Sequence, residues 1–133
     1  MSGRILVIDD EPTVRTVIRV LLEARGFELD LPAVEHRSEA MAASRAARSG
    51  CYDAILLDLK VPFLDPVDLV ERMTTGPVNT PTVIIAGFLH PELLQRLSAL
   101  GVQHFLQKPF GSADLVAAVR GAVASRRTEP SLL

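Results

Sequence analysis

The sequence has little cysteine, no long hydrophobic run and no excess of basic residues, and each absence excludes a class of protein. With one cysteine, Cys51, the chain cannot form an internal disulfide and offers no metal-ligand spacing. The longest apolar run, residues 83–89, is too short to span a bilayer, and the N-terminus lacks a signal-peptide pattern. A formal net charge of −2 argues against a nucleic-acid-binding surface. We therefore expect a soluble, cytoplasmic protein that binds neither membranes nor nucleic acids directly.

The apolar content is high enough for one compact domain. The 133 residues are 48% hydrophobic and 23% charged, which is ordinary for a globular protein of this length. Residues 126–133 have no apolar periodicity, so the domain is expected to span residues 1–125, followed by a tail or the start of a linker. The basic residues comprise twelve arginines but only two lysines, Lys60 and Lys108. Each lysine is therefore a candidate for a specific role.

Five strand-like segments alternate with five segments of helical periodicity. The expected strands are residues 5–8, 27–31, 54–57, 82–86 and 104–107. The expected helices begin at Pro12, after Ser38, after Asp65, at Pro91 and after Ser112. Because several of the strands are apolar on both faces and are separated by helices, the pattern predicts a parallel sheet covered on both sides.

Charged side chains stand where three of these strands end. Asp9, Asp10 and Glu11 follow the first strand with no basic neighbour. Asp58 ends the third strand and Lys108 the fifth. Because the carboxyl ends of parallel strands meet at one edge of a sheet, these side chains are expected to converge. Clustered carboxylates repel one another, so the cluster requires a counter-charge beyond one lysine.

The chemistry of this set suits a divalent cation and an anion. Mg²⁺ prefers carboxylate, water and phosphate oxygens, and Asp9 and Asp10 can supply the carboxylates. Asp58 can attack a phosphoryl group and form an aspartyl phosphate. The metal and Lys108 would then neutralise the phosphoryl oxygens.

Four stretches carry a resemblance to a known family. They are LVIDDE, DAILLDLKVP, TPTVIIAG and LQKPF. With these four stretches in this order, the chain resembles a receiver domain of the two-component response-regulator family, of the chemotaxis-regulator type. The resemblance extends from Arg4 to about Ser125. The resemblance implies a single-domain α/β, doubly wound (βα)5 flavodoxin-like fold. Its five-stranded parallel sheet has the order 2-1-3-4-5, with helices on both faces.

The resemblance also implies a role for each residue of the site. Asp58 is the phosphoacceptor and takes its phosphoryl group from a histidine kinase or phosphotransfer protein. Asp10 is a direct Mg²⁺ ligand, and Asp9 acts mostly through bound water. Asp58 and the backbone carbonyl of Lys60 complete the metal site. Lys108 pairs with Asp58 or with its phosphoryl group.

Two positions concern the passage of the signal. Ala86 ends the fourth strand where the family usually has Thr or Ser, and Phe105 occupies the aromatic switch position. With Ala86 there, the ring of Phe105 has room to turn inward without phosphate. The peptide bond to Pro109 is expected to be cis. The fourth helix, fifth strand and fifth helix, residues 91–123, would bind a downstream partner or a fused output domain, and a weak homodimer through this surface is a second option.

Other interpretations of the same residues stay open. Asp10 and Glu11 could serve only as favourable charges at a helix N-terminus. Lys60 could be simply solvated, and Phe105 plain core. Ala86 keeps open a degenerate receiver that binds partners without phosphorylation. A phosphatase of the haloacid dehalogenase type is disfavoured, because it needs an aspartate where this chain has Lys60.

Overall fold

The computed structural model describes residues 3–75 and 79–128, and in this part of the chain five strands alternate with five helices. The strands are β1 (Arg4–Ile8), β2 (Glu28–Asp30), β3 (Ala54–Asp58), β4 (Thr82–Ala86) and β5 (His104–Gln107). The helices are α1 (Pro12–Glu23), α2 (Arg37–Ala47), α3 (Pro66–Thr75), α4 (Pro91–Ala99) and α5 (Ser112–Thr128). None of the helices in the described residues is both long enough and apolar enough to cross a membrane.

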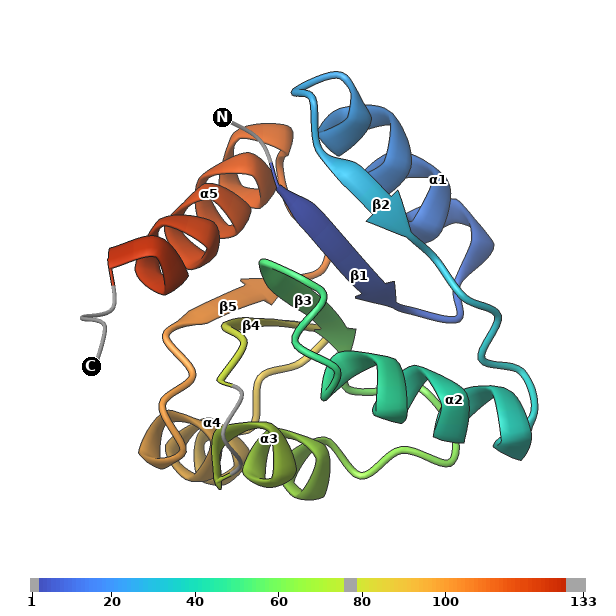
Figure 1. Ribbon diagram of the computed structural model, residues 1–133, viewed down its shortest axis with the longest axis vertical. Coiled ribbons are helices and arrows are strands. Elements are labelled where there is room, and N and C mark those ends of the chain that lie inside the picture. Colours follow the sequence, from blue (N-terminus) through green and yellow to red (C-terminus); the bar gives the residue numbers. More distant parts are fainter. Residues whose placement is uncertain (1–2, 76–78, 129–133) are drawn as a thin grey trace.

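The strands form one parallel sheet in the order β2-β1-β3-β4-β5, which confirms the predicted doubly wound α/β fold. Helices α1 and α5 cover one face, and α2, α3 and α4 cover the other (Figure 1). The chain leaves β1 toward β2 on one side and returns to β3 on the other. The carboxyl ends of β1 and β3 therefore flank the point where the strand order reverses, which is the usual ligand site of such sheets.

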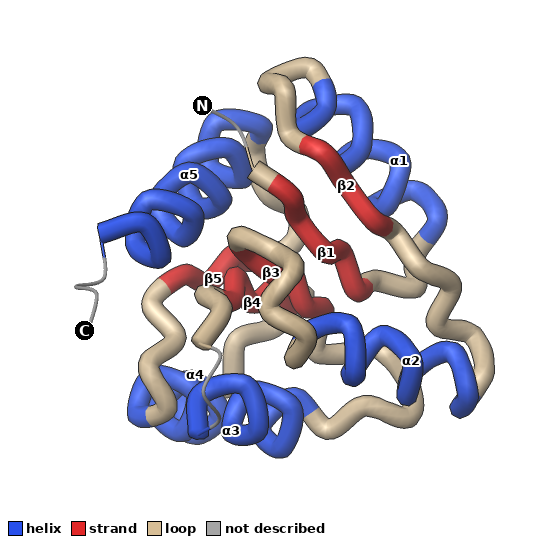
Figure 2. Tube along the Cα trace, viewed as in Figure 1, coloured by secondary structure: helices blue, strands red, loops and turns tan. Residues whose placement is uncertain are grey.

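The core consists of two apolar layers separated by the sheet. On β1, Ile5 and Val7 pack toward α1 and α5, whereas Leu6 and Ile8 pack toward the other three helices. This alternation explains why the central strands are continuously apolar, since both of their faces are buried. Figure 2 shows the loops that join the strand ends to the two helix layers.

The predicted helix start after Asp65 is confirmed, and glycines follow the ends of two helices. Asp65 Oδ1 accepts hydrogen bonds from the N–H groups of Val67 (3.0 Å) and Asp68 (3.2 Å), as expected of an N-cap. Gly26 and Gly101 follow α1 and α4 with positive φ angles of 87° and 102°. An L-residue with a side chain would be strained there, so glycine is suited to end both helices.

The predicted start of α2 is wrong, because the N-cap is His36 rather than Ser38. Glu39, in the first turn, explains the difference. Its Oε1 accepts hydrogen bonds from the N–H groups of Glu35 and His36, both at 3.0 Å. A glutamate at this position pairs with the N–H of the residue three before it, so the helix begins at Arg37. Strand β2 is also shorter than the predicted 27–31.

Helix α5 continues beyond residue 125, so residues 126–128, predicted to be tail, are helical. The guanidinium of Arg126 donates a hydrogen bond to the carbonyl of Gly50 at 3.1 Å, which ties the helix end to the loop before β3. A contact between residues so far apart in the chain leaves no periodic signal in the sequence. The predicted tail residues 129–133 lie outside the described residues.

Candidate functional site

Three aspartates meet at the carboxyl ends of β1 and β3, as the sequence predicts. Asp9 and Asp10 follow β1, and Asp58 is the last residue of β3. One carboxylate oxygen from each lies within 4.8 Å of the others. Asp9 and Asp58 are buried, with 0% and 2% of their surface exposed, and Asp10 is half-buried. Carboxylate oxygens in such a group fit a hard cation such as Mg²⁺.

The side chain of Lys108 reaches into this group from the end of β5. Its Nζ lies 2.8 Å from Asp58 Oδ2, 2.8 Å from Glu11 Oε1 and 3.4 Å from Asp9 Oδ2. Its backbone N–H donates to the carbonyl of Ala86 at 2.8 Å, which places the lysine beside the end of β4. The Lys108–Pro109 bond is cis, as predicted. The structure therefore brings Lys108 together with the three aspartates.

Glu11 is a partner of Lys108 that the sequence reasoning missed. From the sequence, a favourable charge at a helix N-terminus is one open interpretation of Glu11, and the residue does precede α1 as its N-cap. Its extended backbone, with ψ of 115°, accompanies a side chain that contacts Lys108. A third acid directly after an acidic pair, with no basic residue nearby in sequence, was the available signal.

Asp9 is the least satisfied member of the site. Its Oδ1 accepts a hydrogen bond from the N–H of Glu11 at 2.8 Å, but among the described residues its buried Oδ2 has no hydrogen-bond partner. Burial, helped by the negative charge of Asp58, raises the pKa of Asp9 to about 6, although the hydrogen bond from Glu11 and the charge of Lys108 oppose the shift. A buried carboxylate oxygen without a donor is an observation that fits a bound cation.

The charges of the site do not balance. Burial alone would lower the pKa of Lys108, but its bonds to Asp58 and Glu11 prevail and raise the pKa above the usual 10.5. The amine is therefore an ammonium at neutral pH. The carboxylates of Asp9, Glu11 and Asp58 contact this one positive charge, and Asp10 lies in the same group of aspartates. The excess of carboxylates is a second feature that favours a divalent cation.

Both oxygens of Asp58 are held by donors. Oδ1 accepts the N–H of Lys60 at 3.0 Å, and Oδ2 accepts the ammonium of Lys108. Behind it, the N–H of Leu59 donates to the carbonyl of Ile85 at 3.0 Å, which fixes the end of β3 against β4. Asp58 is thus a pre-oriented carboxylate. The predicted role of the Lys60 carbonyl as a metal ligand stays a prediction.

The two predicted switch positions lie on neighbouring strands. Ala86 ends β4, is buried and pairs in register with Gln107. Phe105 is half-buried on β5 and packs against the core layer of α2, α3 and α4. Its ring is therefore neither fully inside nor fully exposed. Their roles in switching stay predictions.

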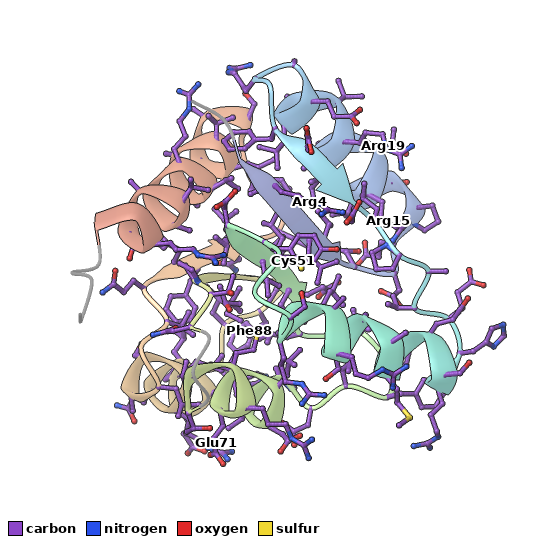
Figure 3. All side chains as sticks on the ribbon, in the orientation of Figure 1. Arg4, Arg15, Arg19, Cys51, Glu71 and Phe88 are labelled. Carbon is purple, nitrogen blue, oxygen red and sulfur yellow. The ribbon has the colours of Figure 1, made fainter. Side chains whose placement is uncertain are left out.

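Arg15 supports the site from α1 and was not singled out from the sequence. Its guanidinium donates to the carbonyls of Asp9 (3.0 Å), Pro32 (3.0 Å) and Leu31 (2.7 Å). Figure 3 labels Arg15 on α1, close to where β1 and β2 end. It joins the loops after β1 and β2 and so holds the backbone of Asp9 in place. Nothing in the local sequence distinguishes this half-buried arginine from the exposed ones.

Comparison with known proteins agrees with this geometry. The family model of the response regulator receiver domain matches residues 5–120. The transcriptional regulatory protein FixJ of Bradyrhizobium diazoefficiens is 30% identical over 130 residues, which are 98% of this chain and 60% of that protein. The chain spans about half the length of the curated relatives it matches.

Two solved structures share the fold. A CheY-like receiver domain protein from Methanospirillum hungatei superimposes with a TM-score of 0.80 at 21% identity, over 98% of this chain and all of that one. The receiver domain of the sensor histidine kinase PA1611 from Pseudomonas aeruginosa has a TM-score of 0.75 at 24% identity, over 93% of this chain and 99% of that one. That crystal structure has a magnesium ion in its active-site cleft.

Proposed function

This chain belongs to the response regulator receiver domain family of two-component signalling systems, and from this premise we propose that it accepts a phosphoryl group on Asp58 and passes the signal to a protein partner. The observation that carries the proposal is the position of Asp58. Its two oxygens are held by an ammonium and a backbone N–H within a cluster of aspartates. On this proposal the chain is a signalling domain rather than an enzyme.

Asp9, Asp10 and Asp58, with the backbone carbonyl of Lys60, would hold Mg²⁺. The Oδ2 of Asp9, which has no hydrogen-bond partner among the described residues, and the excess of carboxylates support this set. Asp10 would be a direct ligand, and Asp9 would act mostly through water. The ion would supply positive charge next to the phosphoryl oxygens, which is its usual contribution to phosphoryl transfer.

The phosphoryl donor would be a phosphohistidine of a histidine kinase or a phosphotransfer protein. One oxygen of Asp58 attacks the phosphorus, so that a P–O bond forms and the P–N bond to the imidazole breaks. The electron pair of that bond stays on the imidazole nitrogen, which then takes a proton. Lys108 is 2.8 Å from the Asp58 carboxylate and would follow the charge onto the phosphoryl oxygens.

The signal would be read on the surface of α4, β5 and α5. A pocket of about 440 Å³ on this surface is lined by residues of β5, of α5 and of the loop between them, and these include Phe105 and Phe110. A downstream protein or a fused output domain would bind there, and a weak homodimer is a second use of the same surface. FixJ is named a transcriptional regulator. Transcriptional regulators of bacteria act on DNA in the cytoplasm, and we propose the same location for this chain. We propose that the domain itself binds neither nucleic acid nor membranes directly.

A degenerate receiver is the second candidate, and Ala86 is the observation that favours it. The residue is buried at the end of β4 and has no hydroxyl to donate to a phosphoryl group. Such a domain would fold and bind partners without being phosphorylated. The two candidates differ in whether Asp58 can be modified at all.

Incubation with acetyl phosphate and Mg²⁺, followed by intact mass measurement, tests the proposal. We expect one added phosphoryl group, about 80 Da, on the wild-type chain, by the aspartyl-phosphate chemistry described above. Asp58→Asn should remain unmodified, whereas Asp68→Asn, which removes an exposed carboxylate on α3, should react like the wild type. An unmodified wild type would favour the degenerate receiver. Modification of Asp58→Asn would show that another residue accepts the group.

A further inference from the structure

The side chain of Lys60 crosses the mouth of the site toward the end of β4. Its backbone is fixed in the loop after β3, because its N–H donates to Asp58 Oδ1. Its Nζ lies 3.8 Å from the position that a β-carbon would have on Gly87, the residue after Ala86. The glycine leaves this space open. The lysine therefore starts beside Asp58 and ends beside β4.

The ammonium of Lys60 has no assigned partner in this position. Lys60 is exposed, and none of the hydrogen bonds or ion pairs found among the described residues involves its Nζ. Lys108, the other lysine, is fully engaged by carboxylates of the site. Lys60 is thus a free cation at the rim of a site that is rich in carboxylates.

The end of β4 is also where the site lacks a side-chain donor, because position 86 is an alanine. Lys108 approaches Asp58 from the end of β5, and the proposed metal ion would lie on the side of β1, next to Asp9 and Asp10. On the β4 side, Ala86 presents only a methyl group. A phosphoryl group on Asp58 would replace one negative charge by about two and add three acceptor oxygens. The oxygen on the β4 side would have no side-chain donor from position 86, so a donor from another residue would be needed there.

We propose that the ammonium of Lys60 binds the phosphoryl group of phosphorylated Asp58 from the β4 side and takes the place of the missing hydroxyl at position 86. The inference rests on the proposed phosphorylation of Asp58. A lysine acts here as a point charge on a flexible stem, so it can follow the phosphoryl oxygen without exact geometry. The same contact would not draw the loop after β4 inward, because Lys60 belongs to the loop after β3.

The test uses beryllofluoride with Mg²⁺, which forms a phosphoryl-like group on Asp58. Affinity is measured for the wild type, Lys60→Gln, Lys60→Arg and Arg19→Gln. Arg19 lies exposed on α1 (Figure 3), and its replacement removes the same charge far from the site. Lys60→Gln should weaken binding about three- to tenfold, between the effect of an exposed ion pair and that of a hydrogen bond to a charged group. Lys60→Arg and Arg19→Gln should stay near the wild type.

A second substitution asks whether Lys60 replaces the hydroxyl. In the wild-type background, Ala86→Thr should change the affinity for beryllofluoride by less than about twofold. In the Lys60→Gln background, the same substitution should recover most of the lost affinity. The two effects are not additive because the threonine hydroxyl and the ammonium would bind the same oxygen. Equal effects of Ala86→Thr in both backgrounds would contradict replacement. Equal losses in Lys60→Gln and Arg19→Gln, or in Lys60→Gln and Lys60→Arg, would contradict a specific contact of the ammonium.

A direct measurement observes the lysine side chains of the wild-type protein, and a variant is needed only to assign their signals. Because the chain has two lysines, ¹³C-lysine labelling gives two sets of side-chain signals, which Lys60→Arg assigns. The Cε signal of Lys60 should shift when beryllofluoride is added, together with that of Lys108. A shift of Lys108 alone would overturn the inference about Lys60 and leave the proposed function intact. No shift of either signal, with no modification of Asp58 by acetyl phosphate, would mean that the proposed function itself fails.

Discussion

At the scale of single residues, Asp9 is where folding and function conflict. Its carboxylate is buried beside Asp58, one of its oxygens has no hydrogen-bond partner among the described residues, and the ammonium of Lys108 is 3.4 Å away. Leaving a buried polar atom unpaired usually lowers stability by about 1–3 kcal/mol. On the proposed function, a bound cation would offset this cost.

Removal of the charge of Asp9 should therefore stabilise the protein when no metal is present. Asp9→Asn keeps an oxygen to accept the N–H of Glu11 and removes the repulsion with Asp58. We expect the free energy of unfolding in urea at pH 7.5, with chelator, to rise by about 1–3 kcal/mol. Asp114→Asn, an exposed change on α5, should alter it by no more than about 0.5 kcal/mol. A destabilised Asp9→Asn would show that Lys108 already balances this charge.

The difference in the free energy of unfolding between Asp9→Asn and the wild type should depend on pH, because the pKa of Asp9 is raised in the folded state. Burial raises the pKa of Asp9 from 3.8 to about 6, so the folded state binds its proton more tightly than the unfolded state. The stabilisation from this proton is complete below pH 4 and is lost as the pH rises through about 6. The advantage of Asp9→Asn over the wild type should thus be largest above pH 7 and shrink toward pH 5. An advantage that does not change with pH would contradict the raised pKa.

At the scale of elements, the strands that could be predicted are those in which consecutive residues are apolar, because such a run indicates a strand buried on both faces. β1, β3 and β4 are apolar on both faces, and their predicted bounds agree with the structure to within a residue. Because parallel strands end at one edge, the meeting of Asp58 and Lys108 could be predicted as well. The start of α2 could not, because the bond from His36 to Glu39 competes with an equally plausible cap at Ser38. The contacts of Glu11 and Lys60 depend on the paths of flexible side chains, which periodicity does not encode.

β4 and β5 should be only weakly coupled to the state of Asp58. The methyl group of Ala86 cannot donate a hydrogen bond to a phosphoryl group on Asp58. Such a bond to a charged group contributes about 1.5–3 kcal/mol to the equilibrium between two conformations of the domain. We expect small amide shifts at Phe105 and α4 when beryllofluoride is added to the wild type, and larger ones in Ala86→Thr. The half-buried ring of Phe105 leaves room for movement in either direction. A large change in the wild type that the threonine leaves unaltered would show that coupling here needs no hydroxyl.

At the scale of the whole molecule, the site draws its parts from the entire chain. Asp9, Asp58 and Lys108 lie in the first, middle and last portions of the sequence, and the sheet order places the ends of their strands side by side. Any ligand that bridges these residues also bridges the strands that carry them. A ligand bound at the site should therefore raise the free energy of unfolding of the whole domain.

Mg²⁺ should stabilise the folded chain because the three aspartates meet only in the folded state. At a free concentration ten times its dissociation constant, an ion that binds only the folded form adds about 1.4 kcal/mol to the free energy of unfolding. We expect the midpoint of thermal unfolding to rise by a few degrees with MgCl2 and not with KCl of equal ionic strength, which separates binding from screening. Asp10→Ala should abolish the rise, although its own midpoint without metal can be higher because one repelling carboxylate is gone. Ala86→Thr is the matched control, since it leaves every proposed metal ligand in place and should show the full rise. If Asp10→Ala keeps the same increase as the wild type, Mg²⁺ is held elsewhere and Asp10 is not its ligand.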